Sequence, residues 1–231
     1  MKKILIIGND IHALRYRDVL LFRHDCEIYF NEIKLNINDY DCIIFSEPYR
    51  FNECYSLLLG EYKNILLLEK SQFDFISVEK LKCKVYYVHL RDFDSNNFDL
   101  NLEVNNYVKW PNLSNQGMDK IYHTLPNILD FLFNFFDGDR TIDLLGCSKE
   151  KKSIKIKVNV CQKNFLINIY DVEVFGELPQ INGVDIQWPN YFKCINDLFN
   201  KVFAEELDFC YSKNREKEFC KIIRKVESLW N

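Results

Sequence analysis

A glycine-containing turn near the start of the chain has most of the residues of a phosphate-binding loop. The segment Gly8–Ala13 (GNDIHA) follows an apolar run and precedes a helical pattern. A loop that cradles a dinucleotide follows G-x-G-x-x-G/A, whose middle glycine lets backbone N–H groups approach the pyrophosphate. Asp10 replaces that glycine and adds bulk and negative charge beside an anionic ligand. The segment is therefore either a modified phosphate loop or a structural turn. Its candidate cofactor-binding residues are Gly8, Asn9, Asp10 and Ile11.

A second polar group follows the next apolar stretch and has the chemistry of a ribose acceptor. In dinucleotide-binding folds, an acidic residue about 20 residues beyond the loop accepts hydrogen bonds from the ribose hydroxyls. Asn31 and Glu32 occupy that stretch, and either side chain can accept such a bond. Two solvated surface residues explain the pattern equally well. Asn31 is therefore either a cofactor-binding residue or a solvated surface residue.

The elements that must position these residues follow a strand–helix rhythm. Continuous apolar runs are typical of strands buried on both faces of a parallel sheet, and helical stretches separate them here. This pattern predicts a doubly wound α/β unit. The stretch 33–40 has room for barely two helical turns, so we expect a reduced sheet. The expected strands are 4–7, 27–30, 42–45, 65–68 and 84–90, and the expected helices are 11–22 and 51–60.

The composition changes between about residues 94 and 117, where Asn and Asp are abundant and periodicity is weak. We expect a domain boundary there, with a Rossmann-like nucleotide-binding domain at 1–95 and an α+β domain with an antiparallel sheet at 96–231. Apolar and polar residues alternate over 154–160, which predicts a half-exposed strand. The other expected elements are a helix at 118–137 with a bend or start near Pro126, a strand at 165–170 paired with 154–160 across a turn near 162–164, and helices at 190–207 and 213–229. On the last helix, Phe219, Ile222, Ile223, Val226 and Leu229 share one face.

Polar residues at two predicted strand ends carry a resemblance to a known family. The turn Ser46-Glu47-Pro48 and the segment Glu69-Lys70-Ser71 each follow an apolar run, and Asn52 lies between them at a fixed spacing. This arrangement resembles the Gfo/Idh/MocA family of NAD(P)-dependent oxidoreductases. In that family a Thr/Ser-Pro turn is followed by a His and then by Glu-Lys-Pro. The resemblance adds Ser46, Pro48, Asn52 and Glu69 to the candidate cofactor-binding residues, and it implies that the last helix packs back onto the first domain.

A third part of the resemblance lies on the helix expected at 118–137. The family has a catalytic Asp there, a catalytic His four residues later and a further Asp three residues beyond. The matching positions of this chain are His123, Asn127 and Asp130. The resemblance thus makes Lys70, His123 and Asn127 the candidate catalytic residues, with Lys70 beside substrate and cofactor.

The substitution at Asn127 matters for the chemistry. Oxidation of an alcohol by nicotinamide also releases a proton, and a carboxamide is not a general acid or base. Lys70 or His123 would have to take that role, and His123 lies one helical turn before Asn127. In the alternative interpretation, His123 is a structural histidine and Lys70 a surface lysine.

The overall composition excludes several classes of protein. The 231 residues are 48% apolar and 28% charged, which is typical of globular domains and not of disordered chains. The net charge of −4 offers no basic field for nucleic acid or an anionic membrane. The nine cysteines contain no CxxC pair, and we found no spacing typical of a metal site, which favours free thiols in the cytoplasm. No signal peptide and no run of about 18 apolar residues is visible, so we expect a soluble cytoplasmic protein.

Three functional hypotheses follow. The first is an NAD- or NADP-dependent oxidoreductase for a sugar, sugar nucleotide or small carbonyl or imine substrate in a biosynthetic pathway. The second is a degenerate, non-redox relative that binds a ligand or protein partner. The third is an enzyme that uses the ligand-binding cleft of this family for a different reaction, without nicotinamide. Gly8 and the Asn52-to-Glu69 spacing favour the first, while Asp10 and Asn127 favour the others. The resemblance also implies homo-oligomers formed through the second sheet, although Lys155 and Lys157 oppose a fully apolar interface there.

Overall fold

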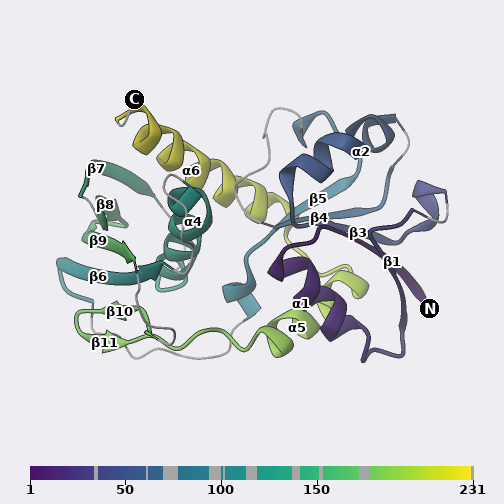
Figure 1. Ribbon diagram of the computed structural model, residues 1–231, viewed down its shortest axis with the longest axis horizontal. Helices are drawn as coiled ribbons and strands as arrows, with labels where there is room; N and C mark the ends of the chain where they lie inside the picture. The colour runs from purple at the N-terminus through teal and green to yellow at the C-terminus, as the bar shows by residue number, and fades with distance from the viewer. Residues whose placement is uncertain are drawn as a thin grey trace. The chain divides into compact units, whose positions relative to one another are not determined.

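The structure, a computed structural model, has two compact units (Figure 1). One unit contains Met1–Asp94 and Asn190–Lys217, and the other contains Ser95–Pro189 and Glu218–Asn231. The structure describes residues 1–33, 36–60, 62–69, 78–93, 100, 102–112, 119–136, 141–150, 153–171 and 177–229.

The first unit includes a segment that the sequence-based division at residue 95 placed in the second domain. The helix α5 (Tyr191–Phe203) buries Cys194, Ile195, Leu198, Phe199 and Val202. These side chains join the same core as the helix α1 (Ile11–Leu20). A contact between distant segments of this kind leaves no local signal in the sequence.

A parallel sheet forms the centre of the first unit. Its five strands have the order β2-β1-β3-β4-β5, and each runs parallel to its neighbours. The predicted alternation of strands and helices is confirmed. The reduced sheet is also confirmed, because 36–40 contains only the short 3₁₀ helix η1 (Ile37–Asp39). The strand expected at 84–90 ends at Val88, and the 3₁₀ helix η2 (Leu90–Phe93) follows His89. The strands are β1 (Lys2–Ile7), β2 (Cys26–Phe30), β3 (Cys42–Phe45), β4 (Ile65–Glu69) and β5 (Lys84–Val88).

Helices cover both faces of this sheet. Ile4 and Ile6 of β1 pack with α1 and α5, whereas Leu5 and Ile7 pack on the other face with the helix α2 (Pro48–Gly60). Successive strand residues point to opposite faces, so a strand covered on both sides has no polar positions. This explains why the strands are continuous apolar runs in the sequence.

The second unit is built on a six-stranded mixed sheet with the order β11-β10-β6-β9-β8-β7. The predicted pairing of β8 (Ser153–Val160) with β9 (Lys163–Asp171) is confirmed, and Ile154, Ile156, Val158 and Val160 are buried. The predicted antiparallel sheet is confirmed, with one parallel pair, in which β6 (Asn105–Asn112) runs beside β9. A helix and a hairpin separate β6 from β9 in the chain, and such a long connection permits parallel pairing. The remaining strands are β7 (Ile142–Lys149), β10 (Gln180–Ile181) and β11 (Val184–Asp185).

The helices α4 (Asp119–Phe133) and α6 (Phe209–Ser228) correct two boundaries. Pro126 lies inside α4 and not at its start. The helix α6 starts before the predicted residue 213, because the Asp208 carboxylate accepts the Tyr211 N–H at 2.8 Å and caps it. Leu229 lies beyond the helix and is exposed, so it is not part of the predicted apolar face. The other four residues of that face are buried in the core of the second unit.

Two sequence-level expectations concern cysteines and membrane spans. None of the nine cysteines, all of which lie in the described ranges, forms a disulfide bond; Cys26, Cys42 and Cys194 are buried, and the others are partly or fully exposed. None of the helices in the described ranges has the length and apolarity needed to span a bilayer.

Candidate functional site

The strand order of the first unit defines where its parallel sheet can bind a ligand. In an open α/β sheet, ligands bind outside the carboxyl ends of the strands, at the point where the strand order reverses direction. Here β1 lies between β2 and β3, and the chain continues outward from β3 to β5. The switch point is therefore between β1 and β3. The segments Gly8–Asp10, Asn31 and Ser46–Glu47 follow β1, β2 and β3 at this edge.

Gly8 is required by a close backbone approach. Its φ is +147°, and a β-carbon added there would lie 1.9 Å from the Ser46 Oγ and 3.3 Å from the Ala13 Cβ. The absence of a side chain at Gly8 lets the turn after β1 pack directly on the end of β3. This is the role of a first glycine in a tight strand-to-helix turn, and it does not depend on a cofactor.

Asn31 holds the turn to the end of β2. Its Oδ1 accepts the Gly8 N–H at 2.8 Å, and its Nδ2 donates to the Gly8 carbonyl at 2.9 Å and to the Asn9 Oδ1 at 2.8 Å. The residue adopts φ +56°, which Asn tolerates better than most residues. The side chain that was expected to accept a ribose hydroxyl is thus engaged with the loop itself.

Two carboxylates accept hydrogen bonds from backbone N–H groups of the turn after β1 and of the first turn of α1. The Glu47 Oε2 accepts the Asn9 N–H at 3.0 Å. Asp10 is the N-cap of α1, and its Oδ1 accepts the Ala13 N–H at 2.9 Å. The amino end of a helix favours anions because of its free N–H groups and its dipole. In this chain the protein's own side chains supply the anions.

Glu47 was not among the residues proposed from the sequence. The family resemblance drew attention to its neighbours Ser46 and Pro48, which match the motif, and not to the residue between them. An acidic residue directly after a strand at the switch point is the signal that would have identified it.

Ser46 is buried beside the loop, with 6% of its surface exposed. Within the described part of the chain, its Oγ has no hydrogen-bond partner. A buried hydroxyl without a partner carries an unfavourable desolvation cost. The hydroxyl is enclosed against Gly8, and it accounts for the close approach of the turn to the end of β3.

Glu69 lies at the end of β4, and only 3% of its surface is exposed. Its Oε1 accepts a hydrogen bond of 2.5 Å from the Tyr16 hydroxyl of α1. Burial, together with the negative charge of Glu69, raises the pKa of Tyr16 well above its ordinary value. The phenol therefore stays protonated, and it holds this oxygen of Glu69 toward α1.

The remaining candidate residues are in different surroundings. Ile11 is the exposed first residue of α1, Pro48 begins α2, and Asn52 is exposed on α2. Lys70 lies outside the described residues. In the second unit, His123 and Asn127 belong to α4. Asn127 is half-buried, and the side chain of His123 is not among those that the structure describes.

No protein-family model and no curated protein sequence matches the chain. Solved structures match its fold over nearly the whole length. A dehydrogenase, MviM, from Clostridium difficile has a TM-score of 0.71 and 12% identity, with 98% of this chain and 99% of that chain covered. GenD2 from gentamicin A biosynthesis, in complex with NAD, has a TM-score of 0.70 and 5% identity, with 98% and 93% covered. Biliverdin reductase from Synechocystis sp. PCC 6803, in complex with biliverdin and NADP⁺, has a TM-score of 0.60 and 10% identity, with 96% and 98% covered. The expected resemblance to Gfo/Idh/MocA-type oxidoreductases is thereby confirmed for the fold.

Proposed function

We propose that this chain is a non-redox protein with a dehydrogenase fold, which binds a neutral, hydroxyl-rich ligand of the sugar class at the carboxyl edge of its parallel sheet. One observation carries the proposal. The N–H groups of Asn9 and Ala13, which belong to the expected phosphate loop, are already bonded to the carboxylates of Glu47 and Asp10.

The residues at the switch point do not fit a nicotinamide dinucleotide. Its pyrophosphate would have to displace Glu47 from the Asn9 N–H and lie close to the Asp10 carboxylate. Two like charges about 4 Å apart repel each other by about 4 kcal/mol at the effective dielectric constant of a protein surface. That repulsion exceeds what a single recovered N–H bond contributes, which is about 1 to 3 kcal/mol.

The position of the acid–base residue also opposes redox chemistry. Asn127 occupies the position at which the resemblance implies the catalytic His, and a carboxamide does not exchange protons at neutral pH. Loss of the phosphate loop and loss of the acid–base group affect two separate steps, cofactor binding and proton transfer. Their coincidence supports a protein that no longer needs either step.

The same carboxylates suit a ligand that donates hydrogen bonds. Each carboxylate has about four lone-pair positions, and each of Asp10 and Glu47 uses one oxygen in the bonds described above. Sugar hydroxyls can donate to the remaining positions without removing the backbone contacts.

The test is calorimetric titration of the purified protein with NADH and NADPH, and then with uncharged sugars and polyols. We expect no saturation by either nucleotide up to about 1 mM, and binding of at least one uncharged sugar in the micromolar to millimolar range that ordinary sites span. Glu47→Gln should weaken sugar binding. Asp18→Asn, which removes a charge from the exposed part of α1, should leave it unchanged. Absence of sugar binding, or equal effects of both variants, would contradict the proposal.

A second candidate function is an NAD- or NADP-dependent oxidoreductase acting on a sugar, sugar nucleotide or small carbonyl or imine. The likeness to GenD2 in complex with NAD and to biliverdin reductase with NADP⁺ favours it. In that case either nucleotide should bind at micromolar concentration in the same titration, and turnover should be abolished by Lys70→Ala. Unchanged turnover in the Lys70→Ala protein would count against this second function.

A further inference from the structure

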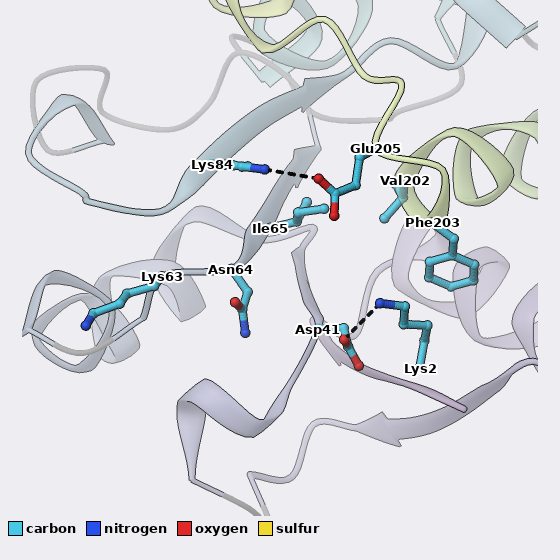
Figure 2. A pocket seen from close by; sticks show the side chains of 9 residues that line it. All are labelled: Lys2, Asp41, Lys63, Asn64, Ile65, Lys84, Val202, Phe203 and Glu205. Carbon is cyan, nitrogen blue, oxygen red and sulfur yellow. Dashed lines mark hydrogen bonds and ion pairs between the residues drawn. The ribbon is translucent and has the colours of Figure 1, made fainter.

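A pocket opens at the other edge of the parallel sheet, where the strands begin. Its volume is about 150 Å³, and all of its lining residues belong to the first unit. Ile65, Val202 and Phe203 supply apolar surface, and Figure 2 shows them between two groups of charged side chains. This pocket is separate from the turn after β1, which lies at the carboxyl edge.

Four of the five charged side chains that line the pocket form two ion pairs, and the fifth is Lys63. The Lys2 Nζ lies 3.2 Å from the Asp41 Oδ1, and the Lys84 Nζ lies 3.5 Å from the Glu205 Oε2. Figure 2 shows one pair at each end of the pocket. Each end therefore presents a cation and an anion, and the pocket does not have a single sign of charge.

The two pairs differ in what they leave available to a ligand. Each Asp41 oxygen already accepts a hydrogen bond, since Oδ1 accepts from the Lys2 Nζ and Oδ2 accepts the Lys3 N–H at 2.9 Å. Lys2 keeps further N–H donors, since an ammonium group has three. The 3.5 Å separation of Glu205 and Lys84 exceeds the length of about 2.8 Å that is typical of a charge-assisted hydrogen bond. One end of the pocket thus offers a donor, and the other offers a carboxylate that can accept.

The backbone of Glu205 supports a specific role for this side chain. Glu205 has φ +59° directly after the C-cap of α5, where the Glu206 N–H bonds to the Lys201 carbonyl at 2.9 Å. Glycine or asparagine is usual at such a left-handed position because a β-carbon is crowded there. A residue kept in a strained conformation is a reason to look for a function. In this structure the conformation places the carboxylate in the pocket.

We propose that this pocket binds a small zwitterion, namely a free amino acid with an apolar side chain. The ligand carboxylate accepts from the Lys2 Nζ, the ligand ammonium donates to Glu205, and the side chain packs on Ile65 and Phe203. The volume suits such a ligand, since a cavity of about 150 Å³ accommodates benzene. A simple anion would meet Asp41 and Glu205, and a simple cation would meet Lys2, Lys63 and Lys84, so neither is matched as well as a zwitterion.

The test is calorimetric titration of the full chain with L-leucine, L-valine and L-phenylalanine. Two analogues of leucine serve as probes of charge: 4-methylpentanoate lacks the ammonium group, and 3-methylbutylamine lacks the carboxylate. We expect at least one amino acid to bind, and leucine to bind at least about tenfold more tightly than either analogue, because each analogue loses one charge-assisted hydrogen bond. Absence of binding by all three amino acids up to about 10 mM, or equal binding of leucine and an analogue, would overturn the proposal.

A pair of variants separates the role of Glu205 from that of general surface charge. Glu205→Gln should weaken leucine binding by about tenfold, and it should strengthen binding of 4-methylpentanoate because it removes a like charge from the pocket. Glu206→Gln removes the same charge from the next residue, which does not line the pocket, and should leave both affinities unchanged. Equal effects of the two variants would contradict the assignment. The outcome is independent of the sugar titration, because the two sites are at opposite edges of the sheet.

Discussion

Charged residues lie at both edges of the parallel sheet, but their bonding partners differ. At the carboxyl edge, Asp10 and Glu47 accept hydrogen bonds from backbone N–H groups. At the amino edge, Lys84 and Glu205 face each other at 3.5 Å, and both side chains are more than half exposed. A carboxylate bonded to the backbone is fixed by the fold, whereas an exposed ion pair contributes little to stability and is readily exchanged for a ligand. The comparison teaches that a carboxylate at a strand end can bind a ligand in two ways: through the lone-pair positions that its backbone bond leaves open, or by exchange of an exposed ion pair.

The largest expected effect comes from Gly8 at the carboxyl edge. Gly8→Ala should lower the free energy of unfolding by about 3 kcal/mol, because the new β-carbon clashes with Ser46 and the backbone is in a region unfavourable to alanine. Denaturant unfolding followed by circular dichroism measures this change.

Two further variants test the cause of that loss. Gly60→Ala adds a β-carbon with nothing within 4 Å, at the end of α2, and should be neutral or stabilising by up to about 1 kcal/mol. Gly8→Ala combined with Ser46→Ala should recover part of the loss, since the Ser46 Oγ is the nearest atom. If Gly8→Ala and Gly60→Ala change the free energy of unfolding equally, the close approach of the turn to β3 does not require glycine at position 8.

The next largest effect concerns the buried contact between Tyr16 and Glu69. Tyr16→Phe should cost about 2 kcal/mol, because it removes a donor from a carboxylate oxygen that is held inside the first unit. Tyr29→Phe removes a hydroxyl that donates to Glu27 at 2.7 Å on a less buried surface, and it should cost less than about 1 kcal/mol. Equal losses in the two variants would show that burial of the Glu69 contact is not important.

The raised pKa of Tyr16 also predicts how stability depends on pH. Because the pKa is raised in the folded state, the contribution of Tyr16 is fully present below its ordinary pKa near 10 and is lost as the pH rises from there toward the folded value. The unfolding free energy of the native protein should therefore fall more steeply above about pH 10 than that of Tyr16→Phe. Parallel curves for the two proteins in denaturant titrations at pH 9 to 11 would contradict this prediction.

A smaller effect is expected at the helix cap. Asp10→Ala should lower the unfolding free energy by about 1 kcal/mol, because it removes the acceptor of the Ala13 N–H at the start of α1. Asp10→Ser keeps a capping oxygen without the charge and should be close to neutral in stability. If both variants unfold like the native protein, Asp10 does not act as a cap and the donors of the turn are free for a ligand.

The sequence predicted the positions of the strands in the first unit better than the hydrogen-bond partners of the residues that follow these strands. The strands are continuous apolar runs because helices cover both faces of the sheet, so burial alone identifies them. Gly8 and Ser46 lie at one edge because they follow the parallel strands β1 and β3, whose carboxyl ends are adjacent. Their bonding could not be predicted, since it depends on which carboxylate reaches which N–H group.

Contacts between distant segments explain the other differences. The position of α5 beside α1 and the parallel pairing of β6 with β9 join residues that are far apart in the chain. The role of Glu205 was equally hidden, because it follows from one left-handed residue after α5 and from its neighbours at the start of the sheet. Periodicity reports which face of an element is buried, but it does not report which element covers that face.

The smallest expected effect returns to the amino edge and has the opposite sign. Glu205→Gly should raise the unfolding free energy by about 0.5 to 1 kcal/mol, because glycine adopts φ +59° without the crowding of a β-carbon. The lost ion pair with Lys84 subtracts little, since both side chains are exposed. The same variant should bind leucine at least about tenfold more weakly, so stability and binding change in opposite directions. At the carboxyl edge, Gly8→Ala and Asp10→Ala should instead lower stability. If Glu205→Gly were destabilising, its conformation would be a favourable part of the fold, and the contrast between the two edges would be lost.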